Sequence, residues 1–105
     1  MARLKLFWTE TVVKQRNYVF SYWNERNGST SYSKKLNRKI NQRISLLKVY
    51  PEIGKKSSFK DVRIASLGHY CLLYKFDNTR LIIVGFWDGR QDPEKLIGLL
   101  KGNGK

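Results

Sequence analysis

The sequence predicts an α+β domain in which an N-terminal helical hairpin packs on a four-stranded, mostly antiparallel sheet. Three observations predict it: an alternating segment opens the chain, two segments of helical periodicity follow, and three short apolar runs separated by turn residues come after them. The resulting element order is β-α-α-β-β-β-α. The length of 105 residues fits one domain over residues 1–105, with a frayed tail expected over 101–105.

The first strand is expected around residues 4–8, because Leu4, Leu6 and Trp8 recur with a period of two. A first helix follows over about residues 10–26. Thr9 is its expected N-cap, and Asn27-Gly28 ends it, because either residue tolerates a left-handed conformation.

The second helix has the clearest pattern in the chain. Its cap is expected among Ser29–Ser31, and Pro51 closes it. The joint between the helices is short, so they are expected to form an antiparallel hairpin. One apolar stripe runs along the second helix at steps of four and three residues: Tyr32, Leu36, Ile40, Ile44 and Leu47.

The remainder of the chain predicts a loop, three strands and a closing helix. Residues 51–60 show no alternation and are expected to form the loop. The strands are expected at about 62–66, 69–76 and 80–87, the second of them central because both of its faces are apolar. Asp92-Pro93 is typical of a helix start, and the closing helix carries Leu96, Ile97, Leu99 and Leu100.

The charge balance indicates a polyanionic or acidic partner. Lysine and arginine number 21 against 8 acidic residues, a formal net charge of +13. Such an excess raises affinity for nucleic acid, the ribosome, anionic surfaces or an acidic protein. No leader segment or membrane-spanning run is visible, so a cytoplasmic location and no membrane partner are expected.

The sequence offers little for cofactor or metal chemistry. Cys71 is the only cysteine, which excludes an intrachain disulfide, and its place in an apolar strand predicts a buried residue. One histidine and scattered carboxylates give no metal-ligand spacing, and no phosphate-binding glycine loop is present. We therefore expect no metal and no cofactor.

The order of elements, together with several short motifs, resembles the RelE/ParE superfamily of toxins from type II toxin–antitoxin modules. The resemblance covers most of the chain, up to Pro93. It rests on the following residues: Tyr50-Pro51-Glu52-Ile53-Gly54-Lys55, Arg63, Gly68-His69-Tyr70, Tyr74 and Arg90-Gln91-Asp92-Pro93. It implies a small cytoplasmic toxin that an acidic, partly disordered antitoxin neutralises in a hetero-oligomer.

The resemblance implies one of two activities. RelE-like members cut messenger RNA on the ribosome with a cluster of basic residues and a tyrosine, whereas ParE-like members poison DNA gyrase. Arg63 and Arg90 lie near two basic positions of the nuclease set. Cys71 stands where the nuclease prototype has an arginine, and Leu96 lies near the position of its tyrosine. These departures favour the ParE-like branch. An antitoxin-binding module without toxicity is a further alternative.

RNA cleavage would require a proton acceptor, a proton donor and cations around the phosphate. Metal-independent cleavage has four candidate catalytic residues: the arginines Arg63 and Arg90, with His69 and Tyr74 as acid or base. Structural roles are the alternative: core packing for Tyr74, and an ion pair with Asp88 or Asp92 for Arg63. The candidate target-binding cations are Lys34, Lys35, Arg38, Lys55, Lys56, Lys60 and Arg80.

Overall fold

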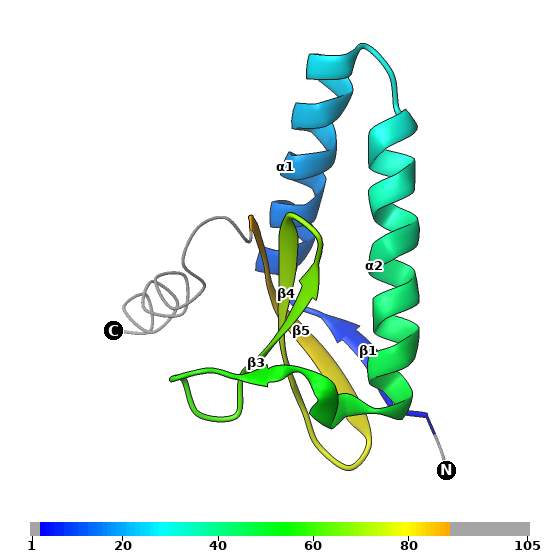
Figure 1. The fold of residues 1–105 in the computed structure, drawn as a ribbon. Coiled ribbons are helices and arrows are strands. Elements are labelled where there is room, and N and C mark those ends of the chain that lie inside the picture. The colour runs from blue at the N-terminus through cyan, green and yellow to red at the C-terminus, as the bar shows by residue number, and fades with distance from the viewer. Residues whose placement is uncertain (1–2, 89–105) are drawn as a thin grey trace.

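The computed structural model describes residues 3–88 and contains a helical hairpin packed on a five-stranded mixed sheet. Figure 1 shows the two helices side by side, with the turn between them projecting beyond the end of the sheet. The closing helix, Arg90 and the tail 101–105 lie outside the described residues.

The first helix, α1 (Glu10–Asn27), begins and ends as the sequence predicts. The Thr9 hydroxyl accepts a hydrogen bond from the Val12 amide at 3.2 Å, and Gly28 takes a left-handed conformation with φ of 64°. Only Val12 is fully buried in α1, so much of this helix faces outward.

The second helix, α2 (Ser31–Val49), places its predicted apolar stripe against the sheet. Leu36, Ile40, Ile44 and Leu47 are buried, while Tyr32 is partly buried and packs on the same core. Thr30 is the N-cap but makes no side-chain cap hydrogen bond. The helix ends before Pro51, as predicted, but a short 3-10 helix, η1 (Pro51–Ile53), follows directly, within the segment 51–60 expected to be a loop.

The sheet has one strand more than the sequence predicts. Its order is β1-β5-β4-β3-β2, and the extra edge strand β2 (Lys55–Lys56) lies within the segment expected to be a loop. Two lysines carry no alternating pattern, so only the pairing of Lys56 with Arg63 and of Lys55 with Ile64 reveals the strand.

The other strands fall within one residue of their expected bounds. They are β1 (Lys5–Trp8), β3 (Arg63–Leu67), β4 (Tyr70–Phe76) and β5 (Arg80–Asp88). The strands β2 to β5 pair antiparallel, and β1 pairs parallel to β5, so the sheet is mixed. Because the helical hairpin connects β1 to the remaining strands, a parallel neighbour at the edge is possible.

Apolar residues lie on both faces of the sheet. The main core lies between the sheet and the helices and includes Leu72, Tyr74 and Phe86. A smaller cluster around Cys71 and Leu73 occupies the other face. Both faces of β4 are thus buried, which confirms its predicted central place in the sheet.

Candidate functional site

Tyr74 joins the central strand to the segment that follows α2. Its side chain is fully buried, and its hydroxyl donates to the Pro51 carbonyl at 2.6 Å and accepts from the Gly54 amide at 2.9 Å. Burial is the main cause that raises its pKa above the ordinary value of 10.0, while the Gly54 amide and nearby Arg63 act in the opposite direction. These contacts give this candidate catalytic residue a structural role.

Arg63 fastens the same segment from the neighbouring strand. Its Nη1 donates to the carbonyl oxygens of Glu52 and Gly54, both at 2.9 Å, and its guanidinium lies 5.9 Å from the ring centre of Phe76. Backbone carbonyls satisfy these donors without neutralising the charge, so Arg63 remains a half-buried cation.

The expected ion pair between Arg63 and Asp88 is wrong. Arg63 pairs with Tyr74 across β3 and β4, whereas Asp88 pairs with Tyr70. Four residues along a strand correspond to about 13 Å, too far for an ion pair. The alternative partner, Asp92, lies outside the described residues.

A basic cavity of about 400 Å³ opens beside Arg63. Lys56 and Lys60 contribute exposed ammonium groups to it, and Phe76 contributes an apolar wall. The Ser57 hydroxyl is engaged by the loop itself, with the Val62 carbonyl 2.7 Å away. Asp61 also lines the cavity, but the three cations outnumber this one carboxylate, so the charge of the lining still favours an anion such as a phosphate.

His69 does not join this cavity. It is an exposed turn residue between β3 and β4, at the opposite end of β3 from Arg63 and therefore more than about 13 Å away. Arg80 begins β5 and is bound to Asp77: its Nη2 lies 2.6 Å from Asp77 Oδ2, and this contact is the main cause of the lowered pKa of Asp77.

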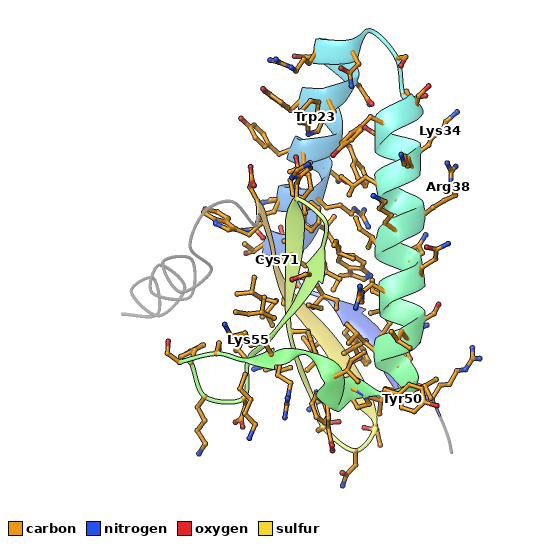
Figure 2. The ribbon with its side chains drawn as sticks, in the orientation of Figure 1. Trp23, Lys34, Arg38, Tyr50, Lys55 and Cys71 are labelled. Carbon is orange, nitrogen blue, oxygen red and sulfur yellow. The ribbon has the colours of Figure 1, made fainter. Side chains whose placement is uncertain are left out.

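Six of the seven predicted target-binding cations, all except Arg80, lie in two separate groups. Lys34, Lys35 and Arg38 are exposed on α2, whereas Lys55, Lys56 and Lys60 are exposed on the segment from β2 to β3. Figure 2 shows Lys34 and Arg38 directed outward from α2, with Lys55 on the side of the molecule opposite to α2 in this view. A single small ligand cannot contact both groups.

The structure also reveals an aromatic groove of about 880 Å³, lined chiefly by the outer face of α1 and the adjoining ends of β4 and β5. Tyr18 and Tyr22 stand in its wall and are 73% and 46% exposed. Trp23 Nε1 donates to the Tyr70 hydroxyl at 2.6 Å, and Tyr70 stacks on Phe86 with ring centres 5.2 Å apart. These contacts make a rigid floor.

No groove was predicted on this face of α1, although a signal was present. Lys14, Tyr18, Tyr22 and Arg26 recur at steps of four and therefore lie in one row along α1. The helical pattern was assigned to the core, but this second row faces away from it. The apolar patterns around the three tryptophans predict core anchors, with the alternative that one of them lines a groove for an antitoxin helix. All three are half-buried: Trp8 packs on the main core, Trp87 packs on the smaller cluster, and both Trp23 and Trp87 line the groove.

Cys71 is buried, as its strand position predicts. Burial is the main cause that raises the pKa of its thiol to about 11, and Asp88 adds to the shift. Within residues 3–88, no group of three or more histidine, cysteine or acidic side chains is placed to hold a metal ion. No helix in the same range is both long and apolar enough to cross a membrane.

A family model described as the ParE toxin of the type II toxin–antitoxin system parDE matches residues 6–93. The chain therefore belongs to the ParE toxin family, a class of toxins in type II toxin–antitoxin systems. No curated protein sequence matches it significantly.

Solved structures of the RelE/ParE superfamily share the fold. A chromosomal ParDE toxin–antitoxin system from P. aeruginosa has a chain that matches with a TM-score of 0.70 and 14% identity, over 82% of this chain and 96% of that one. A YoeB dimer from Staphylococcus aureus matches with a TM-score of 0.60 and 17% identity, over 82% and 97%. The E. coli DinJ–YafQ toxin–antitoxin complex matches with a TM-score of 0.54 and 12% identity, over 85% and 96%.

Proposed function

We propose that this toxin inhibits growth in the cytoplasm by binding DNA gyrase, and that an acidic antitoxin neutralises it. Membership of the ParE family supports the proposal. The observation that carries the mode of action is that neither candidate acid or base within residues 3–88 is available beside Arg63: Tyr74 is its neighbour across the strands but is buried with its hydroxyl bound to the backbone, and His69 lies at the far end of β3. A binding toxin needs neither group.

The gyrase proposal is tested with the purified toxin in a supercoiling assay. We expect inhibition of gyrase at toxin concentrations that leave relaxation by a type I topoisomerase unaffected. The second enzyme is the necessary control, because a protein of charge +13 also coats DNA and would then inhibit both enzymes. Equal inhibition of both enzymes, or of neither, would contradict the proposal.

Induction in cells separates the alternatives independently. A gyrase poison is expected to cause filamentation and DNA-damage signalling while translation continues. An early arrest of translation with cut transcripts would instead indicate a ribosome-dependent endoribonuclease, and unimpaired growth a module without toxicity.

The basic cavity is the observation that favours messenger RNA cleavage as a second candidate function. Lys56, Lys60 and Arg63 outnumber the one acidic residue of the lining, Asp61, around a space that suits a phosphate. Stabilisation of a phosphorane-like transition state by cations contributes to catalysis even where the acid and base are weak. If the toxin cuts RNA, Arg63→Ala should lower the cleavage rate at least tenfold, whereas Arg80→Ala, outside the cavity, should not.

We further propose that the acidic antitoxin occupies the aromatic groove with an amphipathic segment. Exposed aromatic side chains in a preformed groove are typical anchors for a partner helix. Lys14 and Arg26 flank the row of tyrosines at its two ends. Lys14 is paired with Glu10 and Asp88 also lines the groove, so Arg26 is the cation that suits an acidic chain. The groove is also the place where large apolar side chains of α1 remain unburied.

The paired substitution Tyr18→Ser and Tyr22→Ser tests this docking site, with Tyr50→Ser as the matched control. All three hydroxyphenyl groups are exposed, and Tyr50 lies at the C-terminal end of α2 (Figure 2). The small acidic protein encoded beside the toxin is the probe. We expect the paired variant to lose at least tenfold in affinity and the control less than twofold. Equal affinities of the paired variant and the control would reject the groove as the docking site. If the wild-type protein does not bind the neighbouring acidic protein, the assignment of the two as toxin and antitoxin is rejected.

A further inference from the structure

We propose that the outer face of α2 binds the phosphate backbone of a nucleic-acid duplex. This basic face comprises Lys34, Lys35, Arg38 and Lys39, all of which are exposed. The inference does not depend on the gyrase proposal, because it concerns a surface that shares no residue with the aromatic groove or the basic cavity.

The first argument is charge without neutralisation. Residues 31–49 contain six lysines and arginines and no aspartate or glutamate. The two ion pairs within residues 3–88 join Lys14 to Glu10 and Arg80 to Asp77, so neither involves α2. Figure 2 shows Lys34 and Arg38 directed away from the sheet. The basic face therefore presents its full charge to the solvent.

The second argument is that this arrangement opposes helix stability. A helix N-terminus favours negative charge, yet the first turn of α2 holds no acidic residue and Lys34 and Lys35 follow at once. Lys34 and Arg38, like Lys35 and Lys39, stand four residues apart, where like charges repel. By contrast, α1 has Glu10 in its first turn and Arg26 in its last. The first turn of α1 thus follows the stabilising rule and the first turn of α2 departs from it, although Lys48 in the last turn of α2 follows it.

The third argument identifies the ligand by what the face lacks. The large hydrophobic residues exposed within 3–88 are Phe7, Tyr18, Tyr22, Leu46, Tyr50 and Ile53, and none lies between residues 31 and 45. A protein partner needs apolar or aromatic anchors, and single-stranded bases need rings on which to stack. The exposed neighbours of the cations are instead amides and hydroxyls, such as Asn37, Asn41 and Gln42.

Lysine and arginine together with amide side chains are the usual contacts to backbone phosphates, which fix position without reading sequence. The helix is straight enough in Figure 1 to lie along a duplex, and its 19 residues extend about 28 Å. Because the groove involves no α2 residue, the basic face remains available when the groove is occupied.

The test compares two triple variants of the full chain that each lose three positive charges. One carries Lys34→Gln, Arg38→Gln and Lys39→Gln on the basic face, and the other Lys55→Gln, Lys56→Gln and Lys60→Gln on the β2–β3 segment. Affinity for a 20-base-pair DNA duplex, an RNA duplex of equal length and a single strand is measured between 50 and 300 mM NaCl. Each lost phosphate contact should lower the salt slope by about 0.9.

We expect the α2 variant to lose about 2.7 from the slope and at least tenfold in duplex affinity at 100 mM NaCl relative to the β2–β3 variant. Tighter binding of one duplex type shows whether DNA or RNA is the source of the phosphates. Equal losses of duplex affinity in the two variants would overturn the proposal, because net charge alone would then explain binding. Tighter binding of the wild-type protein to the single strand than to either duplex would also overturn it.

A second measurement guards against misfolding. Removing cations that oppose the helix dipole should leave the α2 variant as stable to heat as the wild type, or more so. A clear loss of thermal stability would show that these side chains serve the fold, which would also overturn the inference.

Discussion

At the residue scale, the Tyr74 hydroxyl determines how the segment after α2 is held. It makes two buried hydrogen bonds, to the Pro51 carbonyl and from the Gly54 amide. Tyr74→Phe keeps the ring but leaves both backbone groups unsatisfied, so we expect a loss of about 1–3 kcal/mol in the free energy of unfolding. Urea denaturation measures it. Tyr50→Phe, with an exposed side chain, is the control and should change stability by less than about 0.5 kcal/mol.

The same residue, together with Cys71, predicts the alkaline limit of stability. Burial raises the pKa of Tyr74 above 10.0 and that of the Cys71 thiol from 9.0 to about 11. A raised folded-state pKa gives stability that is complete below the unfolded value and is lost as the pH rises through the folded one. The free energy of unfolding should therefore fall from about pH 9 upward. Cys71→Ala should flatten the fall between pH 9 and 11, and an unaltered profile would contradict the assignment.

Gly54 and Gly28 are required for different reasons. A Cβ at Gly54 would collide with the Tyr74 hydroxyl and ring, although its φ of −69° suits any residue. At Gly28 the space is open, but φ is +64°. Gly28→Ala should cost about 1 kcal/mol of stability and leave the fold intact. Gly54→Ala should cost more, about 1–3 kcal/mol. Because Tyr74→Phe removes the colliding oxygen, the double variant should lose less stability than the sum of the two single losses, and calorimetry of the three variants measures this difference.

At the element scale, periodicity and end signals predicted the helices and the long strands well. The stripe on α2, the Thr9 cap and Gly28 each depend on neighbouring residues and can be inferred from the sequence. The strand β2 depends on a partner in β3, and the parallel pairing of β1 depends on β5. Contacts between distant segments leave no local pattern, so these features could not be inferred.

The candidate site was less predictable for the same reason. The sequence predicts Arg63 as a cation on a strand. Its hydrogen bonds to two backbone carbonyls could not be predicted, because they depend on where η1 lies relative to β3. Tyr74 alternates with core residues, which predicts its burial but not its hydroxyl partners. His69 and Arg63 are six residues apart in sequence, and only the extended geometry of β3 shows that they lie far apart in space.

One buried polar residue joins the two helices of the hairpin, beside the ring contact of Trp23 with Tyr32. The Ser33 hydroxyl lies 2.6 Å from Asn24 Oδ1 and 3.0 Å from the Phe20 carbonyl, joining α2 to the end of α1. Ser33→Ala should lower stability by about 1–2 kcal/mol and increase hydrogen exchange in the last turns of α1 more than in β4. Ser45→Ala, on the exposed side of α2, is the control. Uniform changes in exchange would contradict a local joint.

At the scale of the whole molecule, a net charge of +13 means that folding brings like charges together. Acidic residues number only 8, and the two ion pairs within residues 3–88 are both exposed. Added salt should therefore stabilise this protein: the Debye length falls from about 30 Å at 0.01 M to about 8 Å at 0.15 M, which screens the repulsion.

We expect the melting temperature to rise by several degrees between 10 and 200 mM NaCl, while the affinities for duplex and for acidic antitoxin fall over the same range. Thermal scans and binding titrations in matched buffers measure the two trends. A bound polyanion offsets the repulsion between the positive charges of the protein, and this effect is strongest where salt screens it least. A saturating partner should therefore raise the melting temperature most at low salt. A melting temperature that falls with NaCl in the free protein would show that attractive pairs, rather than repulsion, dominate its electrostatics.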